Sequence, residues 1–149
     1  MFSRSTSLSI LSTYWLLHQG SCVDFITECI TDLIDQQYGY NISCQFNITA
    51  TTANIYHIAL NWTLPSQSTF LFDDNAHFIG GQNPLNSYEG SQALATWDGI
   101  NISNTATLTV YLQPNISITR NQLISSTATL QYYSTFDMSQ NPITLSVEL

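Results

Sequence analysis

The chain has 149 residues, a length that predicts one domain able to bury its own core. It carries 10 acidic residues but only 2 strong bases, so its formal net charge is −8. Because phosphate recognition depends on Lys and Arg, this balance excludes nucleic acid and anionic membrane surfaces as expected partners. Only 8% of the residues are charged, so Ser, Thr, Asn and Gln must form most of the surface.

Residues 1–20 have two interpretations that both remain open. Arg4, the apolar stretch from Leu8 to Leu17 and the small residues after it have the order of a secretory signal peptide. The segment would then be removed, and the mature chain would begin near Ser21 or Cys22. No stretch of the sequence reaches the roughly 18 to 20 apolar residues of a membrane span.

In the second interpretation, the N-terminal segment is retained as an extended assembly strand. Its alternation places four residues on one face and serines on the other; the four are Phe2, Thr6, Leu8 and Ile10. Arg4 interrupts the apolar face. Such a strand predicts pairing with a sheet edge, either in its own sandwich or in a neighbouring copy. Residues 21–149 form the predicted domain in both interpretations.

Apolar residues between Asp24 and Asp35 follow helical spacing, and Asp24 is a suitable cap. They are Phe25, Ile26, Cys29, Ile30, Leu33 and Ile34. We therefore expect a short helix near the N-terminus.

Three cysteines, Cys22, Cys29 and Cys44, predict one disulfide in an oxidising compartment, with one thiol left free, buried or paired between chains. Cys44 lies on the apolar face of a predicted strand. We favour its pairing with Cys29 over its pairing with Cys22, and both pairings remain open. The cysteine spacings fit no zinc finger, and the three histidines do not supply a second ligand pair.

From residue 39 onward, the sequence predicts strands at about 40–49, 55–64, 69–73, 93–102, 105–113, 124–133 and 142–148. Turn signals such as Gly80-Gly81 and Asp98-Gly99 separate them, and residues 75–91 read as a long polar loop. Many short alternating strands indicate an all-β, Ig-like antiparallel sandwich of two sheets. Trp62 and Trp97 are expected in its core rather than on a sugar-binding platform.

Five N-glycosylation sequons lie on these strand-like segments, and each acceptor falls on the polar side of the alternation. The acceptors are Asn41, Asn47, Asn61, Asn101 and Asn115. A glycan must point into water, so the sequons and the apolar pattern agree about which face is outside. N-linked glycans on these residues are expected, in a secreted or cell-surface chain.

The motifs Asn61-Trp-Thr-Leu-Pro, Phe70-Leu-Phe, Thr96-Trp-Asp-Gly-Ile, Ala106-Thr-Leu-Thr-Val and Ser126-Thr-Ala-Thr-Leu follow one another in the chain. Over about residues 39 to 134, their order resembles the conserved-repeat domain of unknown function, an Ig-like sandwich found in tandem in bacterial and archaeal surface proteins. The first 38 residues have no counterpart there. The resemblance implies a stalk or spacer role without catalysis.

No catalytic motif is present, so we expect no enzyme activity. His57 is expected on the outward face of its strand, and Asp73-Asp74-Asn75 reads as a solvated turn rather than a calcium site. No metal or other cofactor is expected.

The sequence hypothesis is a glycosylated subunit of an extracellular filament. Each copy would donate its N-terminal strand to the next copy in a head-to-tail homopolymer. This architecture is similar to that of glycosylated filaments built from strand-exchanged sandwich subunits. The alternative is a secreted or cell-surface Ig-like binding or adhesion module that acts as a monomer.

Overall fold

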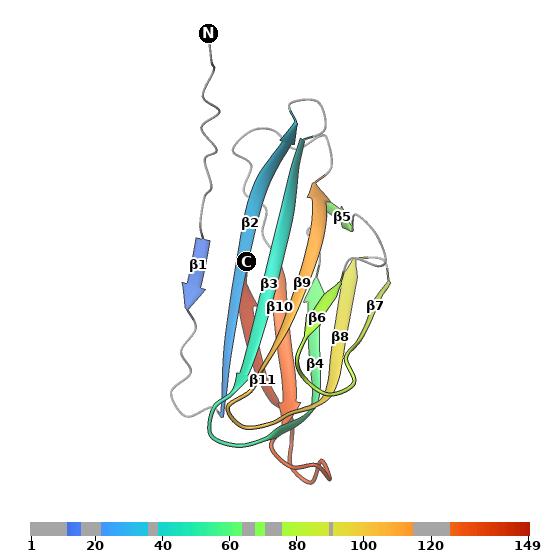
Figure 1. The fold of residues 1–149 in the computed structure, drawn as a ribbon. Coiled ribbons are helices and arrows are strands. Elements are labelled where there is room, and N and C mark those ends of the chain that lie inside the picture. Colours follow the sequence, from blue (N-terminus) through green and yellow to red (C-terminus); the bar gives the residue numbers. More distant parts are fainter. Residues whose placement is uncertain are drawn as a thin grey trace.

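A computed structural model describes residues 12–15, 22–35, 39–63, 68–70, 76–89, 91–114 and 126–149. Their strands form two antiparallel sheets that face each other across one core (Figure 1). This confirms the predicted all-β class and two-sheet arrangement. The donor-strand residues Phe2, Thr6, Leu8 and Ile10 lie outside the described residues, as does the Asp73-Asp74-Asn75 turn.

Sheet A has the order β1-β2-β3-β9-β5, and β6 also pairs with β9. Its strands are β1 (Ser12–Trp15), β2 (Val23–Asp35), β3 (Gly39–Ala50), β5 (Ser68–Phe70), β6 (His77–Ile79) and β9 (Thr105–Pro114). Sheet B has the order β11-β10-β4-β8-β7. Its strands are β4 (Ile55–Thr63), β7 (Leu85–Glu89), β8 (Gln92–Ile100), β10 (Thr127–Tyr133) and β11 (Ile143–Glu148).

The predicted helix at residues 24–35 is wrong, because this segment belongs to strand β2. β2 pairs with β3 in a long antiparallel ladder that runs from Val23↔Ala50 to Leu33↔Tyr40. Several of its residues are β-branched and favour an extended chain. Its inner face buries Val23, Phe25 and Thr27 at every second position. The apolar residues on the other face created the helix-like spacing, and local periodicity does not reveal the distant partner strand.

The predicted loop at residues 75–91 contains two short strands, β6 and β7. All five residues of β7 are exposed, so hydrogen bonding to β8 rather than burial defines this strand. A strand without a buried face has no apolar alternation, which explains why the sequence pattern missed it.

The core lies between the sheets and follows the predicted alternation. Inner residues of β3 and β4 include Phe46, Leu60 and Trp62, and the Phe46 and Trp62 rings meet edge to face at 5.1 Å between centroids. Trp62 and Trp97 are both buried, as expected. Burying one large apolar side chain contributes about 1.5–3 kcal/mol, so this shared layer holds the two sheets together.

Candidate assembly surface and glycosylation positions

Two of the predicted acceptors, Asn61 and Asn101, have exposed side chains. Asn61 lies in the middle of β4, on the outward face of sheet B, where its cross-strand neighbours are Leu94 and Thr129. Asn101 lies in the turn between β8 and β9, in which the Asn104 N–H donates to the Asn101 carbonyl at 3.0 Å. Both positions leave room for a bulky solvated group.

Asn47 is half-buried on the outward face of sheet A. Its Oδ1 accepts hydrogen bonds from Thr107 Oγ1 at 2.8 Å and from Gln45 Nε2 at 3.3 Å. The amide oxygen is therefore held against the sheet. Asn41 lies on β3, but its side chain is outside the described part, and Asn115 is outside the described residues altogether.

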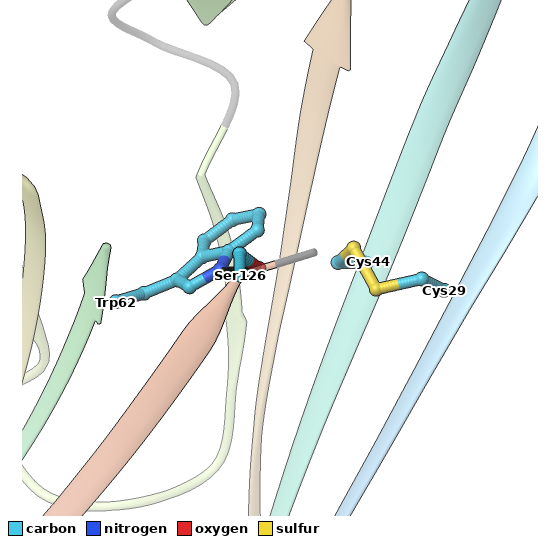
Figure 2. Close-up of a disulfide and its surroundings, with 4 residues drawn as sticks. All are labelled: Cys29, Cys44, Trp62 and Ser126. Carbon is cyan, nitrogen blue, oxygen red and sulfur yellow. Dashed lines mark hydrogen bonds between the residues drawn. A yellow bond between two sulfur atoms is a disulfide. The ribbon is translucent and has the colours of Figure 1, made fainter. Parts of the chain in front are cut away.

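A disulfide joins Cys29 to Cys44 between the neighbouring strands β2 and β3 (Figure 2). The two residues are direct cross-strand partners, with Cα atoms 4.1 Å apart. On the core side of the same region, Trp62 Nε1 donates to Ser126 Oγ at 2.8 Å. A covalent bond within sheet A and a side-chain hydrogen bond between neighbouring strands of sheet B therefore stabilise this flank of the sandwich.

Cys22 is a free, half-buried thiol whose Sγ lies 3.8 Å from the Tyr132 hydroxyl. Burial, reinforced by this hydrogen bond, raises the pKa of Tyr132 above its ordinary value. The phenol therefore stays protonated at physiological pH and remains a neutral core residue.

Strand β1 lies at one edge of sheet A and pairs with β2 of its own chain, from Ser12↔Cys29 to Trp15↔Ile26. The described part of the N-terminal segment is thus an edge strand of its own sandwich. Any donated portion must precede Ser12.

Strand β7 ends sheet B on the opposite flank and pairs with β8 from Leu85↔Thr96 to Glu89↔Gln92. The strand contains no lysine or proline, and the Leu85 side chain is 70% exposed. Natural sheets protect their edges with such residues or with covering segments. β7 is therefore a short edge strand without either of these two protective residues.

An apolar opening between the sheets lies beside β7. It has a cavity volume of about 30 Å³, and its walls include Ala93 on β8 and Leu108 and Val110 on β9. The buried rings of Phe46 and Trp62 form its deeper lining. This space holds one or two waters but no strand, so an incoming segment would cover the opening from the β7 edge rather than enter it.

Sheet A is also interrupted on this flank. β5 pairs with β9 at Leu112 to Pro114, and β6 pairs with β9 at Thr107 to Thr109. Val110 and Tyr111 lie between these two short ladders. The β7 side of the sandwich is thus bordered by short strands in both sheets.

Sequence reasoning missed both the β7 edge and an aromatic cluster formed by Tyr56, His57, Tyr133 and Phe136. His57 is half-buried rather than fully exposed, and its Nε2 lies 3.0 Å from the Phe136 carbonyl oxygen. The Tyr132-Tyr133 pair followed by Phe136 was the available signal, but alternation alone does not show which rings meet across strands.

Within the described ranges, no three His, Cys, Asp or Glu side chains gather in a way that could hold a metal ion. The same ranges contain no helix with the length and apolar character needed to cross a membrane.

No protein-family model and no curated protein matches the sequence. Solved structures with a similar fold include the full-length major pilin SpaD from Corynebacterium diphtheriae, with a TM-score of 0.58 and 11% identity over 84% of this chain and 34% of that chain. The RrgA Jo.In complex gives a TM-score of 0.56 and 9% identity over 83% of this chain and 77% of that chain. A variant of BcpA, the major pilin subunit of Bacillus cereus, gives a TM-score of 0.54 and 12% identity over 83% of this chain and 39% of that chain.

The chain thus spans about a third of the SpaD chain and about two fifths of the BcpA chain. At identities of 9 to 12%, what these proteins share with the chain is a fold. The sandwich has a fold similar to parts of the SpaD and BcpA chains.

Proposed function

We propose that the chain is a structural subunit of an extracellular, N-glycosylated filament that assembles through its N-terminal segment. The segment of one copy pairs with the exposed β7 edge of the next copy. Because this contact joins different surfaces of the two copies, it does not close on itself and propagates as a helical homopolymer.

The observation that carries the proposal is the β7 edge beside the apolar opening. Strand addition needs an edge with available backbone groups and pockets for alternate side chains. β7 ends sheet B, and Ala93, Leu108 and Val110 form an apolar wall next to it. A donated strand would place Leu8 and Ile10 over that wall while its serines face water.

The position of β1 supports a retained N-terminal segment. Residues 12–15 form an edge strand on β2, so removal at Ser21 or Cys22 would delete a strand of the sandwich. β1 also lies at the end of sheet A opposite β5 and β9. β1 would anchor the N-terminal segment at the edge of its own sheet A, and the residues before Ser12 would reach the β7 edge of the neighbouring copy.

The surface chemistry supports an extracellular location. The Cys29–Cys44 disulfide is typical of an oxidising compartment. Glycans on Asn61 and Asn101 would keep the outward face of sheet B soluble in a chain without lysine. Glycans would also oppose lateral association and leave the β7 edge open. The proposed role requires no catalysis and no metal.

The test compares two double variants of the full chain that add the same charge on opposite faces of the segment. Leu8→Asp with Ile10→Asp should abolish fibres in electron micrographs and leave soluble protein with an unchanged melting temperature. Ser7→Asp with Ser9→Asp should still form fibres. Fibres from both variants, or a native chain that begins at Ser21 or Cys22, would contradict strand donation and favour the monomeric adhesion module.

A further inference from the structure

An aromatic patch lies on the outward face of sheet B, formed by Tyr56, His57, Tyr133 and Phe136. The Phe136 ring centroid lies 5.7 Å from that of Tyr56 and 5.5 Å from that of His57, and His57 lies 6.1 Å from Tyr133. The Phe136 side chain is 70% exposed. An apolar ring held at the surface by other rings is typical of an interaction site.

The backbone is shaped to build this patch. His57 has a φ of 48°, and the β4–β10 ladder shifts register between Gln131 and Tyr133. A non-glycine residue in this region costs of order 1–3 kcal/mol, and bulges re-aim side chains. The irregularity brings the His57 ring to the Phe136 carbonyl oxygen.

The Asn101 sequon leaves sheet B next to the patch. Tyr56 is the cross-strand partner of Gly99, and a Cβ at Gly99 would lie 3.6 Å from Tyr56 Cδ1, so the tyrosine ring covers this glycine. Asn101 follows Gly99 by two residues and lies at the start of the turn that leaves β8.

Asn54 connects the sequon to the patch directly. Its Oδ1 accepts a hydrogen bond from the Ile102 N–H at 2.7 Å, and its Nδ2 donates to the Tyr56 hydroxyl at 3.4 Å. Gln82 Nε2 donates to Asn101 Oδ1 at 3.4 Å. Gln82 thus holds the oxygen of the Asn101 side-chain amide. The nitrogen of the same amide, to which an N-linked sugar is attached, is not the atom that Gln82 binds.

We infer that the first sugar of an N-glycan on Asn101 packs against the aromatic patch, with Tyr56 and Phe136 as its contact rings. A pyranose has an apolar face of C–H groups, which an aromatic ring removes from water while the hydroxyl groups stay solvated. The contact would cover Phe136. It rests on the glycosylation that the proposed function includes.

Asn61 provides an internal comparison. It is exposed on the same face of sheet B, but its cross-strand neighbours are Leu94 and Thr129, neither of which is aromatic. A sugar on Asn61 would therefore remain more accessible than a sugar on Asn101.

The experiment uses the full chain secreted from a host that adds uniform high-mannose glycans. The folded glycoprotein is treated with an endoglycosidase that cuts between the first two sugars, and release is measured at each site by glycopeptide mass spectrometry. Phe136→Ala should accelerate release at Asn101 by about 2- to 10-fold, the factor that corresponds to an aromatic contact. The rate at Asn61 should not change.

Two further variants keep the test specific. Phe136→Tyr retains the ring and should restore the slow rate at Asn101, whereas Met138→Ala removes an exposed apolar side chain of the same loop and should leave both rates unchanged. Equal rates at Asn101 in the wild type and in Phe136→Ala would overturn the inference. So would an unmodified Asn101 in the secreted chain.

These outcomes are separable from the failure of the proposed function. Fibres that depend on Leu8 and Ile10 would support strand donation even where the Asn101 sugar is freely accessible. Glycopeptides without sugar at every sequon would overturn both this inference and the glycosylation part of the proposed function.

Discussion

The two flanks of the sandwich are built differently. On the β2–β3 flank, two long strands share a continuous ladder and a disulfide. On the β7–β8 flank, a five-residue strand with no buried residue pairs with β8 beside an apolar opening. The difference separates stability from assembly: the first flank holds the domain together, and the second leaves an edge that a partner could use.

The largest expected effect comes from breaking the covalent flank. Replacing Cys29 and Cys44 by Ala should lower the free energy of unfolding by about 3 kcal/mol, because the disulfide closes a loop of about 15 residues in the unfolded chain. Urea denaturation with matched tryptophan fluorescence would measure the loss. Cys22→Ala is the control and should change stability much less; equal losses in both would contradict the role of the disulfide.

On the β7 flank, one internal constraint is Gly81, which precedes the strand. A Cβ at this position would collide with Trp97 Cδ1, and the backbone φ is 73°. Gly81→Ala should therefore destabilise the domain by about 2 kcal/mol through overpacking and backbone strain.

A double-mutant cycle separates the two causes. Trp97→Ala removes the ring atoms that the new methyl group would meet, so Gly81→Ala should cost less in the Trp97→Ala background than in the wild type. The remaining loss would report the positive φ. An identical loss in both backgrounds would show that Trp97 does not limit this position.

The sequence predicted the covalent flank better than the open one. Alternation in β3, β4, β9 and β10 identified the core and placed Cys44 inside, because each of these strands has one buried face. It failed at β2, where apolar residues on both faces gave helical spacing, and at β7, where no residue is buried. The aromatic patch was missed because it depends on the positive φ at His57 and on a register shift between distant strands.

Charge placed on the β7 edge should separate assembly from stability. Leu85→Lys should change the free energy of unfolding by no more than about 0.5 kcal/mol, because the Leu85 side chain is exposed. It should nevertheless block fibre growth, since lysine protects sheet edges from strand addition. Electron microscopy and thermal melting of the same sample test both halves. Fibres of normal length from Leu85→Lys would show that the edge that accepts the donated strand is not β7.

The smallest effect is expected at the β10–β11 loop, which belongs to neither flank. Hydrogen bonds from Ser139, first from its hydroxyl and then from its backbone N–H, hold the pKa of Asp137 below its ordinary value. The stabilisation is therefore present above the ordinary pKa and is lost as the pH falls through the lower folded-state pKa. Because the carboxylate is fully exposed, the change should be confined to the loop.

The measurement is a pH titration of the Ser139 amide resonance, which should follow the protonation of Asp137 while core amides stay unchanged. Asp137→Asn retains an acceptor for the Ser139 N–H, which lies 3.2 Å from Asp137 Oδ1, and should abolish the titration with little loss of loop order. Core amides that shift together with Ser139 would show that the loop is coupled to the sandwich. In that case the β10–β11 loop would have to be treated as part of the stable structure, together with the β2–β3 flank.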